Sequence, residues 1–133
     1  NGIPAVGGLS EETIFKLQSD VIRKIADATP AVIVGRCADY ILRENPNCFS
    51  VFIHAPMRDR IQRIVNRNTG VTEKEAEELA IKRNKARSAY YNFYTDKTWG
   101  DGASYDMCIN SSILGCQKTA EWIAAFVKEK MTR

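Results

Sequence analysis

The chain has 133 residues, 44% of them hydrophobic and 26% charged, with a formal net charge of +3. This composition is typical of an ordinary globular domain and excludes disordered, collagen-like and low-complexity chains. The length suffices for one hydrophobic core, so we expect a single soluble domain over residues 1–133. No apolar run approaches the ~20 residues of a membrane span, and the N-terminus lacks the basic region of a secretory signal.

Four cysteines and one histidine limit the chemistry that the chain can perform. Cys37, Cys48, Cys108 and Cys116 form no CxxC pair, and three of them lie in or beside apolar segments. We therefore expect reduced, mostly buried thiols, no metal site and a cytoplasmic location. The single histidine, His54, follows an apolar segment and is not favoured as a catalytic group.

The first predicted element is a helix over residues 10–28. Ser10 precedes two glutamates, as at a helix N-terminus, and apolar residues recur at helical spacing until Pro30 ends the pattern. Residues 31–34 are continuously apolar and rich in β-branched side chains. Such a run is typical of a strand that is covered on both faces in a parallel sheet.

Helices and strands alternate along the rest of the chain. The further predicted elements are a short helix over 38–43, a strand over 49–53, helices over 57–68 and 72–94, a loop over 95–104, a strand over 107–109 and a helix over 117–130. The helix over 72–94 has a capping box formed by Thr72 and Glu75. This alternation, with a βαβ unit over 31–53, predicts an α/β fold with a parallel sheet and helices on both faces.

Ligands of such sheets bind at the carboxyl ends of the strands. Three segments follow predicted strands directly, namely 35–36, 54–58 and 110–112. We expect these segments to converge on one cleft. The small excess of positive charge fits an anionic ligand but is below that of most dedicated nucleic-acid modules.

Arg36 is the first candidate for binding an anion. It follows an apolar run and Gly35, so its guanidinium is expected to project into the cleft while the glycine lets a ligand approach the backbone. A planar fork of N–H donors suits a phosphate dianion better than a lysine does. The alternative is a structural ion pair between Arg36 and Asp39.

Two groups of basic residues follow. The first is a row on one face of the helix over 57–68, made of Arg60, Arg63 and Arg67. The second lies within 82–87, where Arg83 and Arg87 are four positions apart and therefore on one side of their helix. Two cationic helices joined by a loop fit a lid that closes over transferring phosphates. A solvated helix face is the alternative.

Aromatic residues and glycines follow the second basic group. The four aromatics within 90–94 can stack on bases, but packing against the core is the favoured interpretation. Residues 99–102, Trp-Gly-Asp-Gly, form a turn whose glycines permit positive φ angles.

Four runs of residues carry a resemblance to a known family. They are Val-Ile-Val-Gly-Arg-Cys-Ala-Asp-Tyr-Ile-Leu at 32–42, Val-Phe-Ile-His-Ala-Pro at 51–56, Ala-Tyr-Tyr-Asn-Phe-Tyr-Thr at 89–95 with Trp-Gly-Asp at 99–101, and Tyr-Asp-Met-Cys-Ile-Asn-Ser at 105–111. With these runs, the chain from about residue 15 onward resembles the cytidylate-kinase-like family of P-loop phosphotransferases. The resemblance implies a three-layer α/β/α fold like that of nucleoside monophosphate kinases. It also implies phosphoryl transfer from ATP, with Mg²⁺, to CMP or a similar small acceptor.

The resemblance assigns roles to particular residues. Gly35, Arg36 and Asp39 are implied to bind the acceptor. A lid-like region over about 63–100 is implied, whose catalytic residues are Arg63, Arg67, Lys85 and Arg87. Asn110 and Ser111 are implied to lie near the adenine of the donor. The implied partners are small-molecule nucleotides, with neither nucleic acid nor a membrane, and exposed sheet edges leave a homo-oligomer open.

The sequence departs from the family's pattern at two places. Cys37 stands where cytidylate kinases have the aspartate of a Gly-Arg-Asp run. The chain also has no Gly-x-x-x-x-Gly-Lys-Ser/Thr run, and the glycines at 2–8 are not followed by Lys-Ser. In this fold the strand before that loop lies centrally, between the strands predicted at 31–34 and 49–53. We therefore interpret the chain as the C-terminal part of a kinase-like domain that lacks its first strand and Walker A loop and is weak or inactive alone.

Two functions from other classes remain as alternatives. One is a non-catalytic nucleotide-binding or regulatory module on a kinase-like scaffold. The other is a single-stranded RNA-binding module that uses the basic residues of 82–87 and the aromatics of 90–94.

Overall fold

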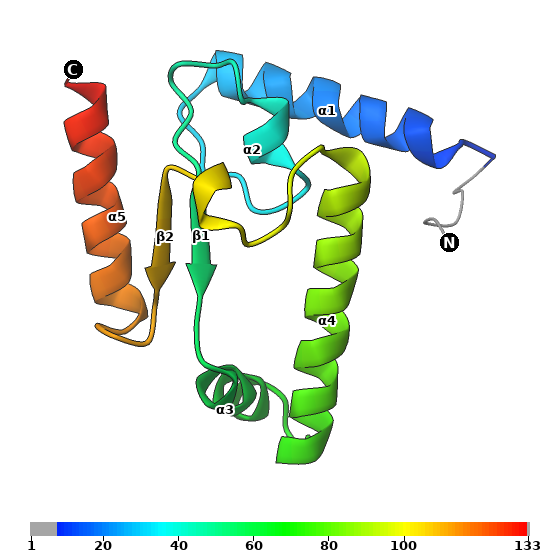
Figure 1. Cartoon of the computed structure of the whole chain (residues 1–133), viewed down its shortest axis with the longest axis vertical. Helices are drawn as coiled ribbons and strands as arrows, with labels where there is room; N and C mark the ends of the chain where they lie inside the picture. The colour runs from blue at the N-terminus through cyan, green and yellow to red at the C-terminus, as the bar shows by residue number, and fades with distance from the viewer. Residues whose placement is uncertain (1–7, 133) are drawn as a thin grey trace. The chain divides into compact units, whose positions relative to one another are not determined.

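The structure is a computed structural model, and it describes residues 8–132. The glycine-containing segment 2–7 lies outside the described residues. The chain forms two compact units, Asn1–Cys48 and Phe49–Arg133, and each is described here by itself. The elements in order are α1 (Glu11–Ala28), α2 (Ala38–Ile41), β1 (Val51–His54), α3 (Met57–Arg67), α4 (Glu73–Tyr94), the short 3₁₀ helix η1 (Gly102–Ser104), β2 (Met107–Asn110) and α5 (Cys116–Met131) (Figure 1).

The first unit contains α1 and α2, which pack on each other. Ser10 is the N-cap of α1, and its Oγ accepts a hydrogen bond of 3.1 Å from the backbone N–H of Thr13. A side-chain oxygen at this position satisfies an amide that the helix leaves without a partner. The structure confirms the helix predicted over 10–28. It also confirms the short helix predicted over 38–43, which ends at Ile41.

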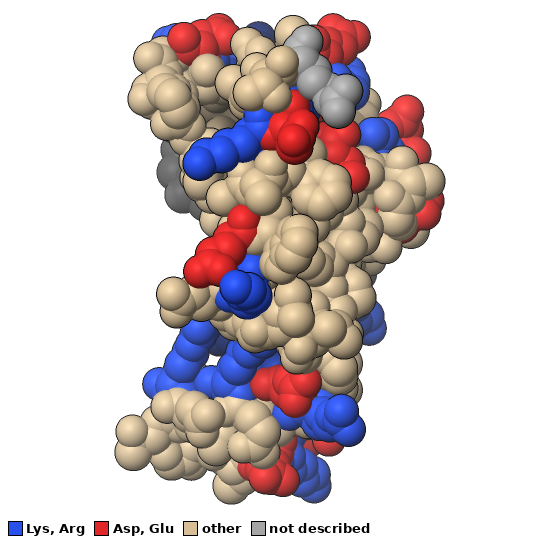
Figure 2. All heavy atoms as spheres, turned by 90° about the vertical axis from the view of Figure 1, so that its left-hand side faces the viewer, with Lys and Arg blue, Asp and Glu red and all other residues tan. Residues whose placement is uncertain are grey.

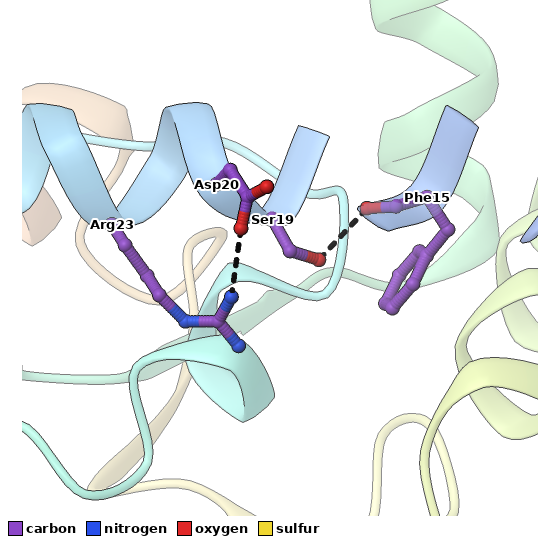
Figure 3. A network of polar contacts seen from close by, with 4 residues as sticks. All are labelled: Phe15, Ser19, Asp20 and Arg23. Atoms are coloured by element: carbon purple, nitrogen blue, oxygen red, sulfur yellow. Dashed lines mark hydrogen bonds and ion pairs between the residues drawn. The ribbon is translucent and has the colours of Figure 1, made fainter. Parts of the chain in front are cut away.

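Polar residues within α1 bond to their own helix (Figure 3). Ser19 is buried, and its hydroxyl donates to the carbonyl of Phe15, four residues earlier, at 2.8 Å. This bond satisfies a polar group that would otherwise cost free energy when it is buried. Arg23 and Asp20 form an exposed ion pair at 3.4 Å, which contributes little to the free energy of unfolding.

The strand predicted at 31–34 is wrong, and so is the βαβ unit built on it. No backbone hydrogen bond joins these residues to any other part of the described chain. The side chains of Val32 and Val34 are 95% and 87% exposed. A β-branched apolar run fits the pleated surface of a sheet, but it becomes a strand only where a second strand pairs with it. None of residues 8–132 provides that second strand.

The second unit contains a two-stranded parallel sheet made of β1 and β2. Val51 pairs with Met107 and His54 with Asn110, so the predictions of strands at 49–53 and 107–109 are confirmed. The α/β class with a parallel sheet is therefore confirmed as well. Both arrows in Figure 1 point toward the end of the unit where α3 lies.

The two faces of β1 pack against different segments, because successive side chains of a strand point to opposite faces. On one face, the ring of Phe49, just before the strand, lies 6.4 Å from the ring of Phe126 in α5. On the other face, Phe52 lies 5.1 Å from the rings of both Trp99 and Tyr105. The loop between α4 and β2 is therefore held on the sheet by aromatic packing.

Packing is also the role of Tyr91, one of the aromatics near the end of α4. Tyr91 is 5% exposed, and its ring stacks on that of Tyr105 at 6.3 Å. The favoured interpretation of residues 90–94 as packing residues is confirmed for this side chain. Phe93, in contrast, is 69% exposed.

The helices α3 and α4 pack on each other, and Figure 1 shows α3 nearly end-on while α4 runs along the vertical of the view. Thr72 caps α4, since its Oγ1 accepts from the backbone N–H of Glu75 at 3.2 Å and its hydroxyl lies 3.1 Å from the Glu75 carboxylate. The predicted capping box is therefore confirmed. A further bond joins the two helices, from the Gln62 amide to the Glu73 carboxylate at 3.0 Å.

The core of the described chain is small. Its buried hydrophobic residues are Ile22, Cys37, Ala38, Ile41, Leu42, Ala76, Ala80 and Tyr91. No large side chain within residues 8–132 is fully buried. Within the same residues, no helix has the length and apolar character needed to cross a membrane.

Gly100 gives a test of the packing over Phe52. It has a φ of +83°, and a Cβ added there would lie 3.3 Å from Cζ of Phe52. We expect Gly100→Ala to lower the free energy of unfolding by about 1–2 kcal/mol, measured by urea denaturation, because alanine is strained at this φ and crowds the ring. Gly102→Ala is the matched control, since its Cβ would meet only Cys108 Sγ at 3.9 Å. Equal stabilities of the two variants would contradict this packing.

Candidate functional site

The first unit carries one unusual backbone segment, the turn before α2. Gly35, Arg36 and Cys37 have φ values of 72°, 57° and 58° in succession. Positive φ is uncommon for residues other than glycine, and each such residue costs roughly 1 kcal/mol or more. Backbone strain of this kind tends to occur at binding sites, where the surrounding structure maintains it. The turn therefore marks the segment of Arg36 as a candidate site independently of any charge.

The thiol of Cys37 lies inside this turn and is 3% exposed. The pKa of Cys37 is raised to about 11, mainly by burial and also by the carboxylate of Asp39, while the guanidinium of Arg36 acts to lower it. The side chain is therefore neutral at physiological pH. An aspartate in its place would add a negative charge beside Arg36.

The exposure of the other three thiols contradicts the expectation of mostly buried cysteines. All four cysteines are free, but Cys108 and Cys116 are exposed and Cys48 is only half-buried. Apolar neighbours in the sequence do not bury a side chain that faces away from the core.

In the second unit, basic side chains meet the carboxyl ends of the two strands. Arg60 donates from Nε to the carbonyl of Ala55, just after β1, at 3.0 Å. Arg63 donates from Nη2 to Oγ of Ser111, just after β2, at 3.3 Å. Both arginines are half-buried, so the alternative of a solvated helix face is wrong for these two residues. Arg67, one turn further along α3, is exposed.

The polar residues after β2 make internal bonds. Oδ1 of Asn110 accepts from the backbone N–H of Ser112 at 2.9 Å, which closes a turn. Ser111 is 3% exposed, and its backbone N–H donates to the carbonyl of His54 at 2.9 Å. His54 itself is exposed, and its ring stacks on Phe52 at 6.4 Å.

One stripe along α4 combines buried residues with arginines. Residues spaced three or four apart share a helix face, and this stripe consists of Ala76, Ala80, Arg83, Arg87 and Tyr91. The alanines and the tyrosine are at most 5% exposed, whereas both arginines are exposed. Arginine therefore occupies the middle of the one helix face that is otherwise packed against the unit. Lys85 lies about 160° around the helix from both Arg83 and Arg87, on its opposite face.

None of the ion pairs found within residues 8–132 involves Arg67, Arg83, Lys85 or Arg87. Figure 2 shows several lysine and arginine side chains in the lower part of one face, with acidic side chains beside some of them. An anion near these side chains would gain favourable electrostatic energy.

Comparison with known sequences identifies the family. A profile of the cytidylate kinase-like family matches residues 4–113. The chain belongs to the cytidylate kinase-like family.

This cytidylate kinase-like chain is similar to two known proteins, one matched by sequence and one by structure. It is 30% identical over 80 residues to the cytidylate kinase of Methanosarcina barkeri (strain Fusaro / DSM 804), a match that covers 60% of this chain and 44% of that protein. It is also similar to the crystal structure of an uncharacterized protein from Eubacterium ventriosum ATCC 27560, with 34% identity and a TM-score of 0.83. That match covers 92% of this chain and 69% of the other. The chain thus spans less than half the length of its curated relative.

The structure brings some of the expected site residues of this cytidylate kinase-like chain together. Arg63 and Ser111 are in direct contact, and Arg87 shares a helix face with Arg83, which the resemblance did not assign. The four-residue spacing of Arg83 and Arg87 in the sequence already predicted that the two share a helix face. Arg36 belongs to the other unit.

Within residues 8–132, no group of three or more His, Cys, Asp or Glu side chains can hold a metal ion. Mg²⁺ at phosphate-transfer sites is usually held by one or two carboxylates together with substrate phosphates and water.

The buried thiol yields a test by chemical labelling. At pH 8 we expect Cys37 to react with a thiol reagent about 100-fold more slowly than Cys108 or Cys116, because its pKa of about 11 keeps it protonated and burial restricts access. Its rate should rise as the pH approaches 11, since the thiolate is the reactive form. Peptide-resolved mass spectrometry measures the three rates in one sample. Equal labelling at pH 8 would contradict the buried, neutral thiol.

Proposed function

We propose that this chain is the acceptor-binding and lid part of an ATP-dependent phosphotransferase that acts on CMP or a similar small monophosphate. The observation that carries the proposal is the pair Arg83 and Arg87 on the packed face of α4. A structural helix normally continues an apolar stripe at such positions. Two exposed guanidinium groups there are explained by an anionic ligand that completes the contact.

Phosphoryl transfer suits these residues because it needs little covalent chemistry from the protein. Positioning and the neutralisation of developing negative charge account for most of the catalysis. Guanidinium groups supply both, since their planar donors match phosphate oxygens. On this proposal Arg63, Arg67, Lys85 and Arg87 act in a lid over about 63–100, with Arg83 added to them.

The acceptor is assigned to the strained turn of the first unit. Gly35 and Arg36 would hold its phosphate, and Asp39 would contribute to its recognition.

The donor site requires residues that this chain does not contain. No Gly-x-x-x-x-Gly-Lys-Ser/Thr run occurs among the 133 residues, and such a run supplies the backbone cradle for the β- and γ-phosphates of ATP. Transfer with ATP and Mg²⁺ therefore requires a P-loop from outside these residues. The same applies to a complete three-layer P-loop fold, whose sheet needs more than the two strands β1 and β2. Asn110 and Ser111 remain assigned to the neighbourhood of the adenine.

Substitution of Arg36 tests the acceptor site. We expect Arg36→Ala to weaken CMP binding by about 2 kcal/mol, measured by calorimetry, because a charge-assisted contact is lost. Arg43→Ala is the matched control, since Arg43 donates to the Tyr40 carbonyl and lies 3.9 Å from the Tyr40 ring centroid. UMP, AMP and a short oligonucleotide are titrated in parallel. Binding of the oligonucleotide alone, with a steep salt dependence, would favour an RNA-binding module instead.

Substitution of Arg87 tests the lid. We expect Arg87→Ala to weaken the binding of inorganic triphosphate, a probe that needs no P-loop, about tenfold, because the guanidinium no longer pairs with a phosphate. Lys74→Ala, an exposed residue in the first turn of the same helix, should leave binding unchanged. Equal effects of the two substitutions would indicate general electrostatic attraction and would contradict a lid role for Arg87.

A further inference from the structure

The hydroxyl of Ser111 connects three separate elements of the second unit. It lies 3.4 Å from the carbonyl oxygen of His54, at the end of β1, and 3.3 Å from Nη2 of Arg63 in α3. Ser111 itself directly follows β2, and its backbone N–H donates to the same His54 carbonyl at 2.9 Å. The side chain therefore lies where both strands end and α3 passes them.

The hydrogen-bonding capacity of this hydroxyl is used within the protein. A serine hydroxyl has one proton to donate and lone pairs to accept. Here it donates to the His54 carbonyl and accepts from Arg63, since the guanidinium can only donate. With Ser111 only 3% exposed, no ligand reaches the hydroxyl. Its contacts thus differ from those of a residue that recognises a base directly.

Most N–H donors of the Arg63 guanidinium are not used by the contact with Ser111. A guanidinium has five N–H donors, and the contact with Ser111 uses one of them. The helix that carries Arg63 is itself tied to the strand end, because Arg60 donates to the Ala55 carbonyl at 3.0 Å. An arginine side chain is long and mobile, so a fixed position reduces the entropy lost when a ligand binds.

We propose that Ser111 is a positioning residue, which holds the guanidinium of Arg63 at the carboxyl ends of β1 and β2 for contact with the phosphates of a bound nucleotide. This role rests on the proposed function. It gives Ser111, which the resemblance places near the adenine of the donor, an indirect role through Arg63.

The neighbouring serine provides a matched control. The Oγ of Ser112 is buried as well, but no hydrogen bond joins it to any of the described residues. Ser112→Ala therefore removes the same atom, one position along the chain, without removing a contact to Arg63.

The experiment is a calorimetric titration with inorganic triphosphate, which tests the phosphate contact without a P-loop, of the unsubstituted chain, Ser111→Ala, Ser111→Thr, Ser112→Ala, Arg63→Gln and the Ser111→Ala/Arg63→Gln pair. We expect Ser111→Ala to weaken triphosphate binding about five-fold and Ser112→Ala to leave it unchanged. Ser111→Thr, which keeps the hydroxyl, should restore binding. In the Arg63→Gln background, Ser111→Ala should have no further effect, because the serine acts only through that arginine.

A second measurement reports the position of Arg63 without any ligand. Side-chain ¹⁵N NMR should show hindered rotation of the Arg63 guanidinium in the unsubstituted chain and in Ser112→Ala, and free rotation in Ser111→Ala. Free rotation in the unsubstituted chain would overturn the proposal even if Ser111→Ala does not fold.

The possible outcomes distinguish a failure of the proposed lid function from a failure of the positioning role of Ser111. Failure of the unsubstituted chain to bind inorganic triphosphate, with Arg63 still hindered in the NMR spectra, would overturn the proposed lid function and, with it, the role of Ser111. Triphosphate binding that is weakened by Arg63→Gln but unaffected by Ser111→Ala would overturn the positioning role alone. A loss in Ser111→Ala that persists undiminished in the Arg63→Gln background would also overturn it, because Ser111 would then act independently of Arg63.

Discussion

The parallel pairing of β1 with β2 is the constraint on which the second unit depends. Its register sets His54 opposite Asn110, and this brings Ser111 to the carbonyl at the end of β1. Parallel strands cannot be joined by a tight turn, so the chain must cross over between them. Here the crossover consists of α3, α4 and the aromatic loop. The basic residues assigned to the lid are thus carried by the connection that the parallel pairing itself requires.

Helical phase, rather than the density of positive charge, decides which basic residues of α4 share its packed face. The segment 82–87 contains four cations, but α-helical geometry places neighbours about 100° apart around the axis. Arg83 and Arg87 therefore continue the stripe of Ala80 and Tyr91, whereas Lys85 lies on the opposite side. In α3 the same geometry, together with the strand ends, engages Arg60 and Arg63 and leaves Arg67 exposed.

Residues 31–34 show that a local preference for extended backbone does not by itself form a strand. Their β-branched side chains favour an extended, paired conformation, yet Val32 and Val34 are almost fully exposed. The free energy of a strand comes from hydrogen bonds and side-chain packing with a neighbour. Among residues 8–132 no strand pairs with residues 31–34. Their apolar side chains therefore remain exposed. The strained turn at 35–37 follows this segment directly.

The sequence by itself determined the elements whose signals are local. The caps of α1 and α4, the two paired strands and the family follow from residues that lie within a few positions of one another, as the bonds of Ser10 and Thr72 show. Only the tertiary structure decided that Arg63 is held by Ser111, that Ser111 is buried, and that 31–34 is not a strand. The reason is that the partners concerned are distant in the chain, 48 positions for Arg63 and Ser111, or are absent from the described residues. No local pattern specifies which remote backbone carbonyl or side chain a residue will meet.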